Sequence, residues 1–464
     1  MDRRMIPRNN TYVPQVLIEW SNMNEEDATW EDWTVMQHRG FHNFGEKEEA
    51  RIKGAMEDII SSMPQDILFI IVRLLPFKEA VKTSILSRNW RFIWLATRNI
   101  DLDERHFVKQ DEESEEHKEH QRRDLIRFTR RWIERYEEPV IHKFRLAFSY
   151  PENHALDLQD CIRLAVARGV KVLDLDFSVP SWNEMSLEDH HEALFDLPLT
   201  VYEDHDENLE SLKLFSCDFL VARFRNFRAL KNLSLDWVDL KSYVVTALLS
   251  NCTVLESLSL KRCWDLSNLD ISAAPSLTSL VVDKCFDLER GIRVDVRTLR
   301  FFKYSGRVIS PLRIEGFRYV VEAVLDFGLE FQFSDCRQIL HDFLFTLCRV
   351  RALTICSYML QGYNIDLPLQ NHNFVLRELD DGVPPCVALT LKVVEVKGFK
   401  GGNNELLALQ YFIRHGNALE KMVISVSKEE GPAGVFGLGL RYRQKAMRLL
   451  QVQRASGSLA IVIS

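Results

Sequence analysis

The sequence lacks the features that mark several common classes of protein. No apolar run approaches the roughly 20 residues that a membrane-spanning helix needs. The first residues, MDRRMIPRNNTYVPQ, contain no apolar signal core, so secretion is not expected. The nine cysteines include no Cys-x-x-Cys pair, which disfavours a zinc ribbon and a thioredoxin-like redox site. We therefore expect an intracellular chain with reduced thiols, located in the nucleus, the cytoplasm or both.

A catalytic signature is also lacking. The serine, histidine and aspartate residues form no nucleophile-elbow, zincin or P-loop pattern. Gly398, Gly401 and Gly402 lie in the segment GFKGG, but the Gly-Lys-Ser/Thr ending of a P-loop does not follow, so a turn is expected there. We expect a protein without catalytic residues, cofactor or metal.

The overall composition is ordinary for a soluble globular chain, with 464 residues, 46% hydrophobic and 27% charged. That length suggests about two to four domains. The net charge of −8 gives no general case for nucleic-acid binding, and we expect neither nucleic acid nor a membrane among the partners.

The segment 58–101 is predicted to form three short helices with apolar faces. The first helix begins near Pro64, which follows two serines. A second helix is predicted to begin within residues 78–86. Trp90 and Trp94 are four residues apart and therefore share one face of a third helix. The apolar stripe of the first helix comprises Ile67, Leu68, Ile71, Leu74 and Leu75. So small a bundle leaves much apolar surface exposed, which usually marks an interaction site.

These residues, MPQDILFIIVRLLPFKEAVKTSILSRNWRFIW from Met63 to Trp94, closely resemble the F-box of plant F-box/leucine-rich-repeat proteins. In that family the F-box binds the Skp adaptor and through it joins a cullin ubiquitin ligase. The resemblance implies adaptor contacts at Pro64, Ile67, Leu68, Ile71, Leu75, Val81, Leu86 and Trp90. The alternative is that these apolar residues form the core of the helical bundle, as we expect for Ile85 and Leu86. We place the F-box at residues 55–101.

Residues 102–123 contain the run DEESEEHKEHQRR, which we expect to be a flexible charged linker. His106, His117 and His120 lie in or beside this run, but no ordered spacing fixes a metal geometry, so a solvated linker is favoured over a metal site. Residues 122–136 carry apolar side chains at helical spacing and are expected to cap the next domain.

The next domain, residues 124–380, is a repeat in which the template L-x-x-L-x-L recurs. Strong copies, at spacings of 21, 25, 22 and 22 residues, begin at Leu209, Leu230, Leu255, Leu277 and Leu299. Weaker copies begin at Ile141, Val170, Val350, Leu391 and Leu419. Each copy is predicted to be one strand whose apolar side chains point into a stack, because one repeat cannot bury its face alone. The expected fold class is α/β: a small helical F-box, then a leucine-rich-repeat solenoid with the form of a horseshoe.

The residue three positions after the last apolar residue of a template copy is predicted to belong to the core. Cys217, Cys263 and Cys285 occupy this position, where the repeat family commonly has Asn or Cys, so we expect buried thiols in place of nucleophiles or metal ligands. The residues that alternate with the apolar positions face the concave surface. Candidate target-binding residues in these rows are Lys213, Phe215, Asp236, Lys261, Asp283 and Lys303. The alternative is a polar, solvated face.

Two further features of the repeat region leave alternatives open. Guanidinium groups concentrate between Arg290 and Arg318, and they either converge to capture a phosphorylated or acidic target or scatter over the outer turns. The longer gap between Val170 and Leu209 contains Trp182 and adjacent histidines at 190 and 191. There we favour a packed aromatic and exposed histidines over a partner-binding loop.

The two ends of the chain carry further resemblances. Residues 381–464 contain LKVVEVKGFKGGNNELLALQYFIRHGNALEKMVISVS, predicted as strand, turn, helix and strand, and are similar to the FBD region of many plant F-box proteins. Residues 1–54 contain VLIEW and ATWED, which resemble the chromodomain-like tail of plant retrotransposon polyproteins. Trp20 matches one position of the aromatic cage that holds methyl-lysine, but Met23 stands where another aromatic is usual. We expect a remnant that is weakly packed or disordered and has no function.

The sequence therefore predicts a non-enzymatic substrate receptor of a Skp/cullin/F-box ubiquitin ligase, with an unknown protein target bound by the repeats. Two alternatives remain. One is a repeat scaffold that assembles no ligase, and the other is a chromatin reader that acts through the amino-terminal segment.

Overall fold

The computed structural model describes much of the chain, and it forms two compact units, residues 1–67 and 68–464. The described residues are 3–8, 11–18, 29–32, 63–108, 114–179, 194–203, 208–219, 227–285, 288, 290–306, 313–314, 319–327, 344–361, 383–428 and 437–464. The first unit contains an antiparallel sheet of β1 (Arg3–Arg8), β2 (Thr11–Ile18) and β3 (Thr29–Asp32). Part of the amino-terminal segment is thus strand, while Trp20 and Met23 lie outside the described residues.

The F-box segment consists of short helices, as predicted, but its third helix is almost absent. Its elements are α2 (Gln65–Leu74), α3 (Phe77–Lys82) and the 3-10 turns η3 (Thr83–Ile85) and η4 (Ile93–Ala96). Pro76 caps the start of α3. Trp90 lies in the turn before η4, so Trp90 and Trp94 do not share a helix face as expected.

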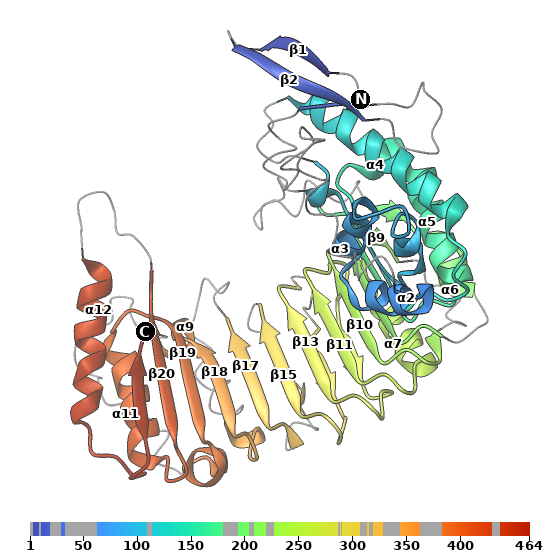
Figure 1. The fold of residues 1–464 in the computed structure, drawn as a ribbon. Helices are drawn as coiled ribbons and strands as arrows, with labels where there is room; N and C mark the ends of the chain where they lie inside the picture. Colours follow the sequence, from blue (N-terminus) through green and yellow to red (C-terminus); the bar gives the residue numbers. More distant parts are fainter. Residues whose placement is uncertain are drawn as a thin grey trace. The chain divides into compact units, whose positions relative to one another are not determined.

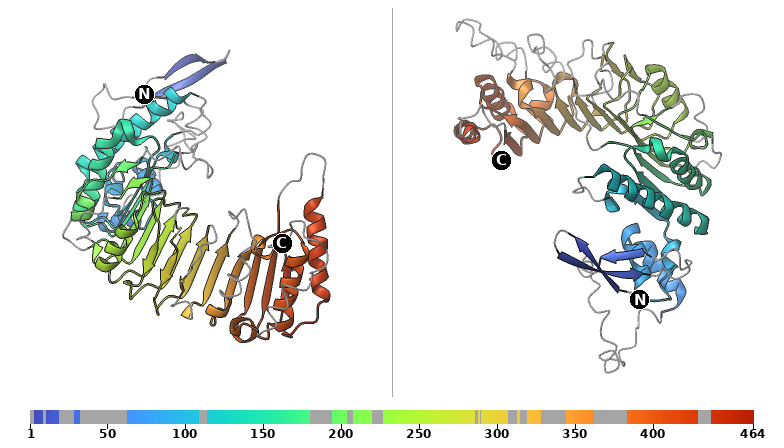
Figure 2. Two further views of the ribbon diagram at one scale, coloured as in Figure 1. Left: turned by 180° about the vertical axis from the view of Figure 1, so that it is seen from behind. Right: turned by 90° about the horizontal axis from the view of Figure 1, so that it is seen from above.

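A single 13-stranded sheet, parallel throughout, dominates the second unit. Figures 1 and 2 show its strands side by side in chain order. They are β4 (Asn99–Asp103), β5 (Lys143–Ala147), β6 (Val172–Asp176), β8 (Ser211–Phe215), β10 (Asn232–Asp236), β11 (Ser257–Lys261), β13 (Ser279–Asp283), β15 (Phe301–Ser305), β17 (Glu322–Asp326), β18 (Ala352–Cys356), β19 (Val393–Phe399), β20 (Lys421–Val426) and β21 (Ala460–Ile463). Equivalent residues pair across neighbours, with Leu233 opposite Leu212 on one side and Leu258 on the other. The predicted repeat solenoid is confirmed.

The sheet buries one face and leaves the other open. Leu212 and Leu214 of β8 are buried, whereas Lys213 between them is exposed, as the alternation of a strand requires. Helices cover the buried face. Val245, Leu248 and other apolar residues of α7 belong to the same core as the strand leucines. We call the other side of the sheet, which carries the alternate strand residues, the open face.

The remaining elements connect or cover the strands. The helices are η5 (Glu104–His106), α4 (Glu115–Arg135), η6 (Pro151–His154), α5 (Ala155–Ala167), α6 (Thr200–Glu203), α7 (Ser242–Asn251), α9 (Ser357–Gln361), the π-helix η10 (Cys386–Thr390), α11 (Asn403–His415), α12 (Leu438–Met447) and η11 (Arg448–Gln451). Two small parallel sheets pair β7 (Phe195–Asp196) with β9 (Cys217–Asp218), and β14 (Ile292–Val294) with β12 (Leu269–Ile271) and β16 (Arg313–Ile314).

The described part of the expected linker, residues 102–123, is ordered structure. It contains the end of β4, the turn η5 and the first half of α4. Asp103, Glu104 and Arg122 are buried in spite of their charge. They can be buried because oppositely charged side chains pair with them: Arg145 lies 2.6 Å from Asp103, and Arg122 lies 3.6 Å from Glu104.

A left-handed residue follows several strands and turns the next side chain into the core. Ser216, Trp237, Arg262 and Lys284 have φ between 48° and 58°, and the backbone N–H of each donates to the last carbonyl of the next strand. Cys217, Cys263 and Cys285 come directly after three of these residues and are 0%, 0% and 3% exposed. Burial raises the pKa of Cys217 and Cys263 well above its usual value. The prediction that these cysteines belong to the core is confirmed.

Candidate docking and target-binding surfaces

The F-box helices expose an unusual number of large apolar side chains. Among them are Ile70 (56%), Leu74 (81%), Ile85 (55%), Leu86 (59%) and Phe92 (44%), which we call the F-box surface. Ile70 and Leu74 are four residues apart on α2 and therefore share a face of that helix. Burying such side chains in an interface yields about 1.5–3 kcal/mol each, so this surface is suited to a protein partner.

The predicted adaptor contacts divide between this surface and the interior. Leu68 and Trp90 are 1% and 2% exposed and pack inside the bundle, so they can only support the surface from below. Pro64, Ile67 and Leu86 are exposed. Ile71, Leu75 and Val81 are half-buried.

The expectation that Ile85 and Leu86 belong to the core is wrong. The chain tightens from α3 into the 3-10 turn η3, and this change of period buries Thr83 and turns Ile85 outward. Sequence reasoning also missed Ile70, Leu74 and Phe92 as surface residues. A signal was present: residues 67–72 are apolar without interruption, which indicates a helix with more than one apolar face.

Aromatic and ionic contacts attach the F-box to the first rungs of the sheet. The ring of Phe77 lies 6.5 Å from that of Trp132 in α4, and Trp94 stacks on Phe128 at 6.0 Å. The carboxylate of Glu138 accepts hydrogen bonds from Arg73 and Arg98, each at 2.8 Å. Burial alone would raise the pKa of Glu138, but the hydrogen bonds from these arginines outweigh it and lower the pKa below its ordinary value.

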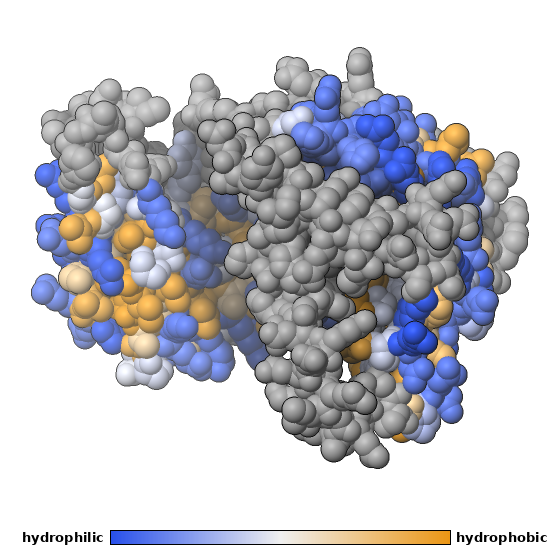
Figure 3. Space-filling view, turned by 45° about the horizontal axis from the view of Figure 1, so that its top comes forward, coloured by the Kyte–Doolittle hydropathy of each residue, from blue (hydrophilic) through white to orange (hydrophobic). Residues whose placement is uncertain are grey.

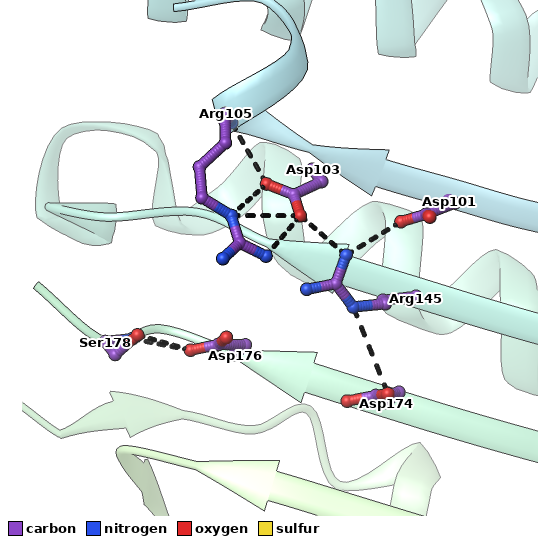
Figure 4. Close-up of polar contacts among 7 residues, drawn as sticks. All are labelled: Asp101, Asp103, Arg105, Arg145, Asp174, Asp176 and Ser178. Atoms are coloured by element: carbon purple, nitrogen blue, oxygen red, sulfur yellow. Dashed lines mark hydrogen bonds and ion pairs between the residues drawn. The ribbon is translucent and has the colours of Figure 1, made fainter. Parts of the chain in front are cut away.

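The open face of β4, β5 and β6 carries a ladder of paired charges (Figure 4). Arg145 lies 3.1 Å from Asp101, 2.6 Å from Asp103 and 4.0 Å from Asp174. Burial would raise the pKa of Asp103, but hydrogen bonds from Arg105 and Arg145 hold it well below its ordinary range. Burial does raise the pKa of Asp174, in spite of the nearby charges of Lys213 and Arg145. Most of these groups bind one another, but three carboxylates against the two guanidinium groups of Arg105 and Arg145 leave the ladder slightly acidic.

All the candidate target-binding residues of the repeats lie on the open face, in adjacent strands. Lys213 is exposed, and Phe215, Asp236, Lys261, Asp283 and Lys303 are half-buried. Several of these side chains contact one another or neighbouring residues. Lys303 lies 2.5 Å from Asp283, and Arg262 donates to both oxygens of Asp236 while its guanidinium lies 5.6 Å from the ring of Phe215. Their role in target binding stays a prediction.

Of the arginines between 290 and 318, those whose side chains the structure describes, Arg290, Arg293, Arg297 and Arg300, do not gather with Lys303 on the open face. Arg293 belongs to β14 of a separate small sheet, where its guanidinium lies 3.9 Å from Asp270. Arg290, Arg297 and Arg300 are exposed in the connecting segments. Arg307 and Arg318 lie outside the described residues, as do Trp182, His190 and His191.

The glycine-rich segment before α11 is a turn, as expected. The carboxylate of Glu405, which is completely buried, accepts hydrogen bonds from the backbone N–H groups of Lys400 and Gly402. An internal carboxylate therefore occupies the position that a phosphate would need at this helix start. Ser357 of α9 also donates to Glu405, so the contact fixes α11 to its neighbour.

Two features are absent from the described residues. No group of three histidine, cysteine, aspartate or glutamate side chains in them is arranged to hold a metal ion. Among the same residues, no helix has the length and apolar character to cross a membrane.

Comparison with known proteins agrees with this architecture. Residues 60–99 match the model of the F-box domain, and residues 139–447 match a model described as At1g61320/AtMIF1, LRR domain. In Arabidopsis thaliana, the putative F-box/LRR-repeat protein At1g56400 is 30% identical over 424 residues, which cover 86% of this chain and 84% of that protein. The putative F-box/FBD/LRR-repeat protein At1g66290 of the same plant is 28% identical, covering 66% of this chain and 64% of that protein.

F-box domains generally bind Skp-type adaptors within cullin ligases, and F-box/LRR proteins are typically non-catalytic. The helical F-box, the in-register parallel sheet and these matches lead to one assignment: the chain belongs to the F-box/leucine-rich-repeat protein family.

Proposed function

We propose that this chain is the substrate-recognition subunit of a Skp/cullin/F-box ubiquitin ligase. The observation that supports this proposal most is the F-box surface, with Leu74 81% exposed beside a bundle that is otherwise well packed. In this proposal a Skp-type adaptor covers the F-box surface and links the chain to cullin. The open face of the repeats captures a protein target in the nucleus, the cytoplasm or both.

The chain contributes position and no bond-making chemistry to such a ligase. Phe77 of the F-box and Trp132 of α4 belong to one core, so the adaptor-binding end is packed directly on the first rungs of the sheet. A target on the open face is then held near the conjugating enzyme that cullin recruits, which raises the effective concentration of target lysines. We assign residues 381–464 to an FBD region, and we give the chromodomain-like segment 1–54 no part in this function.

The test measures binding of the full chain to a purified plant Skp adaptor. The double variant Leu74→Asp/Leu86→Asp is expected to lower the affinity by tenfold or more, about 1.4 kcal/mol per tenfold step, because it places charges at the centre of an apolar interface. The matched control is Leu156→Asp, since Leu156 is 75% exposed on α5 of the repeat region. That control is expected to bind like the wild type.

Variants at Leu68 or Trp90 are unsuitable for this test because both side chains are buried, and their loss would also unfold the bundle. Absence of adaptor binding by the wild type, or equal binding by the Leu74/Leu86 variant, would contradict the proposal. The repeat scaffold without a ligase would then be the better explanation.

A further inference from the structure

The open face changes character along the sheet and gains aliphatic side chains towards the carboxy-terminal strands, where they alternate with polar ones such as Thr354, Lys397 and Lys421. Aliphatic residues of β17 to β21 occupy it and form what we call the aliphatic patch: Val324, Ala352, Val393, Val423 and Val462. Ala352 pairs with Val393, and Val423 pairs with Val462, so these side chains are direct neighbours across the sheet. Hydrophobic side chains gather in the corresponding area at the left of Figure 3.

The aliphatic patch remains accessible in the chain. Val462 is 43% exposed, and the other members are half-buried. β-branched side chains on a strand are stiff, so little conformational entropy is lost when a partner covers them. At the opposite end of the same face, charged side chains such as Asp101, Arg145 and Asp174 lie where the carboxy-terminal strands have aliphatic ones. The two ends of the open face therefore differ in what they offer a ligand.

Glu395 is a carboxylate within the aliphatic patch, and Glu322 lies at its edge, opposite Ala352. Glu395 follows Val393 by two residues on β19 and pairs with Val423 on one side and Thr354 on the other. Its side chain is 34% exposed, accepts a hydrogen bond from Oγ1 of Thr354 at 3.4 Å, and lies 3.8 Å from Nζ of Lys397, whose side chain is 60% exposed. So exposed an ion pair contributes little in water. A partner that covers the patch removes water from Glu395, which is costly unless the partner supplies a cation of its own.

We propose that the aliphatic patch binds a segment of the protein target in which aliphatic side chains flank a lysine or arginine that pairs with Glu395. This inference rests on the proposed function and specifies the chemistry of the target. The aliphatic contacts supply affinity, and Glu395 supplies selection, because a target without a cation would leave the buried carboxylate with only its weak contacts to Thr354 and Lys397. A guanidinium suits the role best, since it can bind a carboxylate through two parallel hydrogen bonds.

The experiment selects short random peptides by phage display on the full chain, immobilised through a terminal tag so that it is independent of adaptor binding. Enriched peptides are expected to combine aliphatic residues with a lysine or arginine. Their affinity is expected to fall by about tenfold or more in Glu395→Lys and in Val423→Asp. Replacing the peptide cation by glutamate is expected to restore binding to Glu395→Lys and abolish binding to the wild type.

The matched control is Asp160→Lys, which makes the same reversal of charge at a site on α5 that is 65% exposed and outside the strands of the open face, and it is expected to leave peptide binding unchanged. Failure to enrich any peptide, enrichment of peptides without a cation, or full affinity for Glu395→Lys would overturn the proposal. Adaptor binding by the same preparations, measured separately, shows whether the proposed function fails as well.

Discussion

At the scale of single residues, polar groups far apart in the sequence determine how this protein is held together. Glu138 joins Arg73 of α2 to Arg98 at the start of the sheet, and Arg145 joins the carboxylates of β4 and β6. None of these pairs was predicted, because apolar periodicity places residues on faces but does not show which charges meet across elements. The same limit explains why buried Asp103 and Glu104 were expected in a solvated linker.

The pairing of Glu138 makes stability depend on acidity. Because the pKa of Glu138 is lowered in the folded chain, its contribution is present above the ordinary value of 4.5 and is lost as the pH falls through the folded pKa. Glu138→Gln is expected to lower the free energy of unfolding by about 1–2 kcal/mol near neutral pH. The difference from the wild type should shrink as the pH falls below 4.5. Urea unfolding of both proteins at several pH values measures this.

A suitable comparison is Glu79→Gln, since Glu79 pairs with Lys82 at an exposed site and should change stability little at any pH. A constant difference between Glu138→Gln and the wild type across the pH range would show that the carboxylate charge of Glu138 does not matter.

At the scale of elements, the repeat template located most strands of the sheet and missed three. Ala323 stands at an apolar template position in β17, where leucine was sought. β4 spans the boundary at residue 101 that was placed between the F-box and the linker, and β21 consists of AIVI, a run too short to show the full template. The exposed face of the F-box was predicted only in part, because the switch to the 3-10 turn η3 leaves no mark in the hydrophobic spacing.

The left-handed residues after β8, β10, β11 and β13 lead to a further prediction. Lys284 has a φ of 55°, a conformation that a β-branched residue adopts only under strain, whereas asparagine adopts it readily. Lys284→Val is expected to lower the free energy of unfolding by about 1–2 kcal/mol, and Lys284→Asn should leave it nearly unchanged. Thermal or urea unfolding measures both.

Lys261→Val is the control for this experiment, because Lys261 is an extended residue of β11 where valine fits well. Equal loss of stability in the valine variants at 261 and 284 would mean that the side chain of lysine, and not the backbone conformation, is responsible.

At the scale of the whole molecule, one hydrophobic core runs from Phe77 of the F-box through every rung of the sheet to Leu459. The sequence suggested separate modules joined by a linker, since local patterns can assign elements but not reveal that their cores are continuous. The strands of residues 381–464 likewise extend the repeat sheet as its last rungs.

Because the core is continuous, a substitution in the core of the F-box is expected to destabilise the repeats as well. Phe77→Ala is expected to lower the free energy of unfolding by about 3–5 kcal/mol, because Phe77 is 4% exposed within that core. The repeat region should then unfold in a single transition at a lower midpoint. Circular dichroism and tryptophan fluorescence should report the same midpoint. Phe92→Ala, at an exposed site, should change stability little, and a repeat transition unaltered by Phe77→Ala would disprove the coupling.

The in-register pairing of the strands also bears on how such a protein changes in evolution. Leu258 lies opposite both Leu233 and Leu280, so a gene that lost codons 258–279 would still bring leucine against leucine, whereas loss of one codon would turn a strand inside out. Unequal exchange can therefore add or remove whole rungs. Each such event changes the distance between the aliphatic patch and the F-box by about 4.8 Å, the spacing of neighbouring strands. The distance between the ligase and a bound target can therefore change in evolution by steps of one strand.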